Sequence, residues 1–148
     1  MNRINLICLG VRDMKVALDF YKRIGFQTFE KTEQPAIVFF NNQGSKLELF
    51  PIEELAKDIN EAAPPMIQER GFNGITLACN VKSENEVDDM MARVKKNGGE
   101  IVKDPVRTSW GGYSGYFQDI DGYYWEVAYG PSWKFDENEM LIIEETQI

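Results

Sequence analysis

The sequence predicts an α+β fold made of two βαβββ modules in tandem, on the basis of three observations. Strand-like and helix-like segments occur twice in the same order, glycine and glutamate recur at matching places in both halves, and alternating apolar residues give the strands one face to bury. A chain of 148 residues is long enough for one core. We therefore expect a single domain over 1–148, with modules at 4–50 and 74–130, a linker at 51–73 and a C-terminal extension at 131–148.

The first module begins with a strand-like segment at 4–11. Asp13 follows as a candidate N-cap, and apolar residues recur at helical spacing until Gly25 ends the expected helix. The pattern then changes to that of strands, which we expect near 26–30, 36–41 and 45–50.

The second module repeats this order, beginning with a strand at 74–81. Ser83 and Glu86 form a capping box for a helix that ends at the Asn-Gly-Gly of 97–99. Three more strands are expected, near 100–106, 114–118 and 123–129.

Two glycines place the halves in register, because each precedes a glutamate by four residues. Gly44 is followed by Glu48, and Gly122 is followed by Glu126. If the halves are copies of one module, the two glutamates occupy equivalent positions. In one interpretation, both glutamates are strand carboxylates exposed to water, or Glu48 pairs with Lys46 on the same face. The other brings them together in a cup, where a proton or a cation must separate their charges.

Alternation divides the strand residues between two faces, because side chains two positions apart on a strand point the same way. One face is apolar and suits a core covered by two amphipathic helices: Ile7, Leu9, Val11, Leu47, Leu49, Ile75, Leu77, Cys79, Val81, Trp125 and Val127. The other mixes polar, small and aromatic groups and suits a ligand cup: Leu6, Cys8, Lys46, Glu48, Phe50, Thr76, Ala78, Asn80, Tyr124 and Glu126.

The remaining segments are a linker and an extension. The linker combines a short helical stretch with a Pro-Pro break at 64–65, and it either joins the modules or covers the cup. The extension reads as a turn at 136–138 followed by a strand at 140–143. Asp119 and Asp121 read as turn residues.

Composition narrows the classes of partner and the compartment. With 16 basic and 24 acidic residues, the net charge is −8, which disfavours nucleic acid and anionic membrane surfaces and mildly favours cations. No apolar run reaches membrane-spanning length. The two cysteines, Cys8 and Cys79, show neither zinc-site nor disulfide spacing. We expect free thiols in the cytoplasm and no membrane partner.

Two stretches resemble the vicinal oxygen chelate superfamily, which includes glyoxalase I, extradiol dioxygenases and bleomycin-resistance proteins. They are LGVRDMKVALDFYKRIGF in the first half and GGYSGYFQDIDGYYWEVAYGP in the second. The resemblance covers roughly residues 4 to 131. It implies the glyoxalase/bleomycin-resistance/dioxygenase fold, in which curled mixed sheets surround a cup, commonly in homodimers. The resemblance does not indicate which activity of the superfamily this protein has.

The resemblance also implies where metal ligands stand in metal-binding relatives. Those positions are Leu6 and Glu48 in the first module, and Thr76 and Glu126 in the second. The chain contains no histidine, so the carboxylates remain without imidazole ligands. Protein sites for zinc, nickel and iron(II) generally include nitrogen or sulfur ligands. We therefore expect no cofactor, while magnesium or manganese held by the two carboxylates stays open as an alternative.

The sequence favours a small-molecule-binding protein whose cup takes an aromatic or cationic ligand without a transition metal. One alternative is a lyase or dioxygenase of the same superfamily with a metal on Glu48 and Glu126; another is a metal-free acid/base enzyme with Glu126 as the base. In either enzyme these two glutamates are the candidate catalytic residues. The candidate ligand-binding residues are Leu6, Cys8, Phe50, Thr76, Trp110, Tyr113 and Tyr124.

Overall fold

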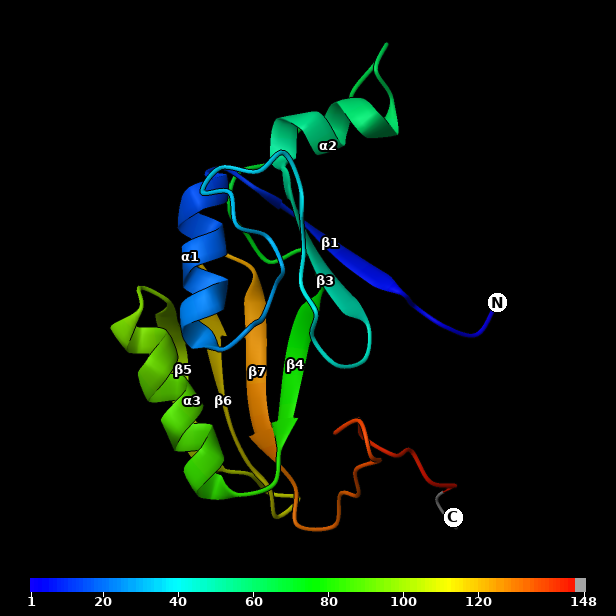
Figure 1. Cartoon of the computed structure of the whole chain (residues 1–148). Helices are drawn as coiled ribbons and strands as arrows, with labels where there is room; N and C mark the ends of the chain where they lie inside the picture. The colour runs from blue at the N-terminus through cyan, green and yellow to red at the C-terminus, as the bar shows by residue number, and fades with distance from the viewer. Residues whose placement is uncertain (146–148) are drawn as a thin grey trace.

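A computed structural model describes residues 1–145 and has two mixed β-sheets with helices packed against them (Figure 1). In the first module, β1 (Leu6–Val11) is followed by α1 (Met14–Ile24), β2 (Val38–Phe39) and β3 (Lys46–Pro51). The strand order is β1-β3-β2, with β1 parallel to β3 and β2 antiparallel to it. This arrangement leaves β1 at one edge of its sheet.

The second module forms a four-stranded sheet of the same design. It contains β4 (Thr76–Val81), α3 (Glu84–Lys96), β5 (Glu100–Arg107), β6 (Tyr113–Gln118) and β7 (Tyr124–Tyr129). The order is β4-β7-β6-β5, so its first strand is again at an edge and parallel to its last. The predicted α+β fold of two related modules is confirmed.

The helix boundaries follow the predicted capping residues. Asp13 accepts a hydrogen bond from the backbone N–H of Val16 at 3.0 Å, and Gly25 ends α1 with a φ of 120°. Ser83 accepts from the N–H of Glu86 at 3.2 Å, while the Glu86 carboxylate accepts from the N–H of Lys82 at 2.6 Å. Both ends of this reciprocal cap satisfy donors that a helix N-terminus leaves unpaired.

One hydrophobic core joins the two modules. Helices α1 and α3 lie side by side on the same side of the molecule (Figure 1). Tyr21 of α1 is 1% exposed and its ring centroid lies 6.1 Å from that of Trp125 in β7. Phe26 and Phe117 also contact Trp125, at centroid distances of 5.8 and 6.1 Å. The second module's tryptophan is therefore buried among aromatic residues of both modules.

The strand predicted at 26–30 does not form, and the one predicted at 36–41 is reduced to β2. Local side-chain hydrogen bonds replace the strand ladder. The Thr28 hydroxyl donates to the carbonyl of Phe39 at 2.7 Å, and the Glu30 carboxylate accepts from the N–H groups of Lys31 and Thr32. Short polar contacts of this kind compete with sheet formation.

The linker contributes α2 (Ile52–Ile59), which confirms its predicted helical stretch. In the extension, Asp136 accepts backbone hydrogen bonds from Asn138 and Met140, as the predicted turn requires. The strand predicted at 140–143 is wrong: in the described part of the extension, the ladder contact is a single bridge between Phe135 and Leu141. Among residues 1–145, no helix is long and apolar enough to cross a membrane.

Equivalent glycines occupy left-handed turns in both modules, since φ is 72° at Gly44 and 90° at Gly122. A side chain at 122 would also crowd Arg70, whose Cγ and Cδ lie 3.2 Å from the position of an added Cβ. We expect Gly122→Ala to lower the free energy of unfolding by about 1–3 kcal/mol. Urea denaturation measures this loss. Gly71→Ala, where an added Cβ has ordinary space, is the control; equal effects of both changes contradict the account.

Candidate functional site

The two predicted glutamates lie on two different sheets, each on the face opposite the core. On the first sheet, Glu48 is paired in register with Cys8 of β1 and Phe39 of β2. We call this surface, which also includes Leu6, the first glutamate face. Its apolar members are open to solvent, since Leu6 is 46% and Phe39 51% exposed.

The second glutamate face belongs to the second sheet. Glu126 is paired in register with Ala78 of β4 and Tyr116 of β6, and Thr76 and Tyr124 share this surface. Glu48 and Glu126 are both half-buried. The equivalence predicted from the glycine spacing therefore holds for their places in the two sheets.

Next to each glutamate lies a side chain whose pKa is raised: Cys8 beside Glu48 and Tyr116 beside Glu126. Burial and the neighbouring Glu48 carboxylate raise the pKa of the Cys8 thiol to about 11. Burial and the Glu126 carboxylate likewise raise the pKa of the Tyr116 hydroxyl. Cys8 is consequently a poor nucleophile, because the thiolate is the reactive form. Both groups remain protonated hydrogen-bond donors near neutral pH.

Neither glutamate has a cationic partner among residues 1–145. The proposed pairing of Glu48 with Lys46 is absent there, because the Lys46 ammonium donates to the carbonyl of Asn42 instead. Half-buried carboxylates that make no ion pair favour a negative potential on both faces.

The donors do not fit the metal site of the histidine-containing relatives. Leucine and threonine occupy two of the four positions, Leu6 and Thr76. Within residues 1–145, no group of three or more histidine, cysteine, aspartate or glutamate side chains is placed to hold a metal ion. A thiol whose pKa is raised adds little, since metal binding requires the thiolate.

The remaining candidate residues are distributed over several surfaces. Phe50 is half-buried on β3. Trp110 is 53% exposed and stacks on Trp133 of the extension, with centroids 5.4 Å apart. The Tyr113 hydroxyl donates to Asp88 of α3 at 2.7 Å, which places this tyrosine on the helix-covered face. Tyr124 makes an edge contact with Phe72 of the linker at 5.5 Å.

One hollow in the described chain was not predicted. It has a volume of about 450 Å³ and lies between β1, the linker residues 68–73, the start of β4 and the turn before β7. We call it the linker cavity. Of the predicted ligand-binding residues, Cys8 and Tyr124 line it. The others do not: Leu6, Phe50, Thr76, Trp110 and Tyr113. The candidate catalytic residues Glu48 and Glu126 do not line it either.

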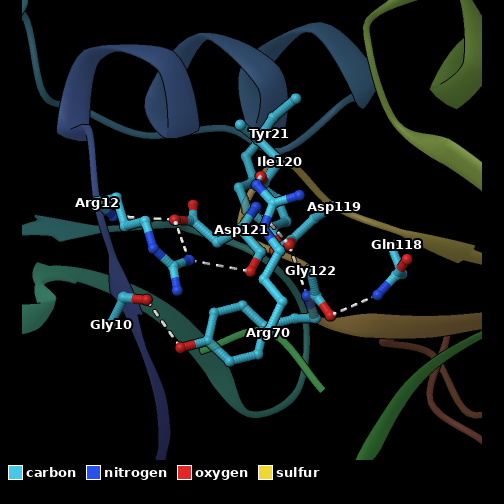
Figure 2. A network of polar contacts seen from close by, with 10 residues as sticks. Gly10, Arg12, Tyr21, Arg70, Gln118, Asp119, Ile120, Asp121 and Gly122 are labelled. Atoms are coloured by element: carbon cyan, nitrogen blue, oxygen red, sulfur yellow. Dashed lines mark hydrogen bonds and ion pairs between the residues drawn. The ribbon is translucent and has the colours of Figure 1, made fainter. Parts of the chain in front are cut away.

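A network of polar contacts holds the turn that borders this cavity (Figure 2). The Asp119 carboxylate accepts from the Tyr21 hydroxyl at 2.5 Å and from the N–H groups of Asp121 and Tyr123 at 3.0 and 2.8 Å. Burial raises the pKa of Asp119 to about 6, although these hydrogen bonds oppose the shift. Asp119 thus anchors the turn to α1.

The same turn is tied to β1 and to the linker. Asp121 accepts from the backbone N–H of Arg12 at 2.9 Å, and the Arg12 guanidinium lies 3.7 Å from its carboxylate. The Tyr123 hydroxyl donates to the carbonyl of Gly10 at 2.7 Å. Arg70 of the linker lies over the turn and donates to the carbonyl of Ile120 (Figure 2). These contacts fix the walls of the linker cavity.

Comparison with known proteins agrees with the observed fold. The family model of the glyoxalase/bleomycin resistance protein/dioxygenase superfamily matches residues 3–127. A glyoxalase-related enzyme from Fulvimarina pelagi is 26% identical, with a TM-score of 0.85 over 98% of this chain and 100% of that chain. No curated protein matches the sequence.

Two more distant structures show the shared fold alone. A lactoylglutathione lyase from Agrobacterium tumefaciens is 24% identical, with a TM-score of 0.65 over 91% of this chain and 98% of that one. A glyoxalase/bleomycin resistance protein/dioxygenase family enzyme from Burkholderia phytofirmans PsJN is 18% identical, with a TM-score of 0.71 over 84% and 96%. The family match over most of the chain is decisive: this protein belongs to the glyoxalase/bleomycin resistance protein/dioxygenase superfamily.

Proposed function

We propose that this protein binds a small aromatic cation in a cup formed by the first glutamate face of one subunit and the second glutamate face of its partner. One observation carries the proposal: Glu48 and Glu126 are half-buried carboxylates without an ion-pair partner in the described chain. A bound cation would compensate both charges. The proposed cation is organic, because the side chains present are a poor fit to a transition-metal ion.

The surroundings of the glutamates favour an organic cation with an aromatic body. Phe39 and Leu6 beside Glu48, and Tyr116 and Tyr124 beside Glu126, offer apolar and aromatic contact area. Aromatic rings attract cations through their negative faces, and a carboxylate adds a direct ion pair. The net charge of −8 assists the approach of a cation.

A homodimer is part of the proposal because each face alone is open. Leu6 and Phe39 are 46% and 51% exposed, Thr76 and Ala78 are exposed as well, and β1 and β4 are edge strands of their sheets. Exposed apolar residues around an open strand edge are typical of surfaces that bind a partner. The free thiols of Cys8 and Cys79 support placing this dimer in the cytoplasm.

A metal-free enzyme is the second candidate, because Glu126 lies beside a protonated hydroxyl. The carboxylate would act as a base and Tyr116, whose raised pKa keeps its proton, as the acid. The two candidates differ in one respect. Glu126→Gln removes cation affinity from a binding protein, whereas in an enzyme it removes turnover and leaves binding of a neutral substrate.

Isothermal titration with N-methylquinolinium tests the leading candidate, with quinoline at pH 8 as the neutral probe of the same shape. We expect the cation to bind, and Glu48→Gln and Glu126→Gln each to weaken it about tenfold or more, because an enclosed ion pair is lost. Quinoline binding should change little. These substitutions keep the shape and polarity of the side chains, so folding should be preserved.

The matched control is Glu100→Gln, an exposed glutamate at the start of β5. It changes the net charge equally and should leave the affinity for N-methylquinolinium within about twofold, since water and salt screen distant charges. Equal weakening by all three variants would show a general charge effect. Failure of the wild-type protein to prefer the cation over quinoline would refute the proposed site.

A further inference from the structure

The linker cavity has features that the proposed cation site does not use. Its volume of about 450 Å³ is within the usual range of small-molecule pockets, which is roughly 300–1,000 Å³. Glu48 and Glu126 are not among its lining residues. Cys8 and Tyr124 border both the cavity and the glutamate faces, so the two sites adjoin while their charged groups differ.

The walls of the linker cavity are apolar and aromatic on several sides. Ile7 and Leu9 come from β1, Leu77 comes from β4, and Tyr123 and Tyr124 come from the turn and β7. Phe72 of the linker lines it as well and contacts the ring of Tyr124. Flat apolar side chains arranged in this way suit a planar hydrophobic body.

Two guanidinium groups line the same cavity, and they differ in their partners. Arg12 is paired with Asp121, which is buried, so these two charges compensate each other. Arg70 donates to the carbonyl of Ile120, and its charge opposes the raised pKa of Asp121, but it makes no ion pair within residues 1–145. A guanidinium has five N–H donors, so most of those on Arg70 are available to a ligand.

We propose that the linker cavity binds an organic carboxylate with a planar apolar body, whose carboxylate pairs with Arg70. A guanidinium and a carboxylate form two parallel hydrogen bonds, which suits the position of Arg70 over the turn. Glu69 also lines the cavity, but it is exposed, where water weakens its repulsion of an anion. Asp121 also lines the cavity, but Arg12 already compensates its charge.

Arg70 has a second part in the site, because it ties the linker to the turn that borders the cavity. Its aliphatic stem packs against Gly122, and its head group reaches the carbonyl of Ile120 (Figure 2). The linker segment 68–73 is thereby held over the gap between β1 and the turn. A carboxylate that binds Arg70 would add a further contact to the linker in this position.

Titration with 2-naphthoate tests the proposal, and 2-naphthamide serves as the neutral probe of similar shape. The wild-type protein should bind 2-naphthoate more tightly. Arg70→Gln, which keeps the length of the side chain and one donor group, should weaken 2-naphthoate about tenfold or more and change 2-naphthamide little. Arg70→Lys should retain part of the preference because it keeps the charge.

Two further variants make the test specific. Arg107→Gln removes an exposed arginine that pairs with Glu84 outside the cavity, and it should bind both probes like the wild-type protein. Ile75→Trp places a large ring at an exposed lining position and should weaken both probes. Circular dichroism of each variant checks that the fold is retained.

The proposal is overturned if wild-type protein does not bind 2-naphthoate at millimolar concentration, or if Arg70→Gln weakens both probes equally. The experiments also distinguish failure of this proposal from failure of the proposed cation site. Glu126→Gln should leave 2-naphthoate affinity unchanged, and Arg70→Gln should leave N-methylquinolinium affinity unchanged, since the two residues line different surfaces.

Discussion

Trp125→Ala is expected to lower the free energy of unfolding by about 3–5 kcal/mol, which is a large part of the stability of a domain of this size. Trp125 is 7% exposed, stacks on Phe117 and contacts Tyr21 and Phe26 of the first module. Its indole N–H donates to the Tyr21 hydroxyl at 3.1 Å. The substitution would leave a cavity where the two modules share their core.

Urea denaturation followed by circular dichroism and by fluorescence measures this effect. Trp125→Phe should cost less, because it retains an aromatic ring and loses the indole donor. Trp110→Ala is the matched control, since Trp110 is 53% exposed and should contribute far less. A loss for Trp125→Ala no larger than that for Trp110→Ala would contradict a core shared between the modules.

Asp119→Ala is expected to cost about 3 kcal/mol or more, because it leaves several buried donors without an acceptor. Asp119 is 4% exposed and accepts from the Tyr21 hydroxyl and from two backbone N–H groups of its turn. Alanine replaces none of these contacts. Asp104→Ala, at an exposed position on β5, is the control and should change stability little.

The contribution of Asp119 should also depend on pH in a defined direction. Burial raises its pKa from 3.8 to about 6, so the folded state holds this proton more tightly than the unfolded state. The stability gained from the proton is complete below about pH 4 and is lost as the pH rises through about 6. Relative to Asp119→Asn, the wild-type protein should lose about 2–3 kcal/mol between pH 4 and pH 7. A difference that stays constant over this range would contradict the raised pKa.

The sequence was sufficient for the parts of the fold that depend on local pattern. Asp13, Gly25, Ser83 and Glu86 cap the helices as predicted, because capping needs only neighbouring residues. The turn glycines, 78 residues apart at Gly44 and Gly122, both adopt positive φ. A repeated turn with a glutamate at a fixed distance therefore located equivalent strand positions in the two modules.

Features that depend on contacts between distant segments could not be predicted in this way. Asp119 reads as an ordinary turn residue, yet its partner Tyr21 is 98 positions away. The linker cavity is formed by β1, the linker and the turn before β7, and no spacing relates these segments. The available signal was Arg70, the basic residue that follows the Pro-Pro break at 64–65 in the linker.

The most direct test of the proposed cup is titration of a mixture of Glu48→Gln and Glu126→Gln proteins with N-methylquinolinium. If each cup combines Glu48 of one subunit with Glu126 of the other, a mixed dimer has one cup with both glutamates and one with neither. After unfolding and refolding together in equal amounts, about a quarter of the cups should regain wild-type affinity. A mixture that binds no better than the separate variants would contradict a cup shared between subunits.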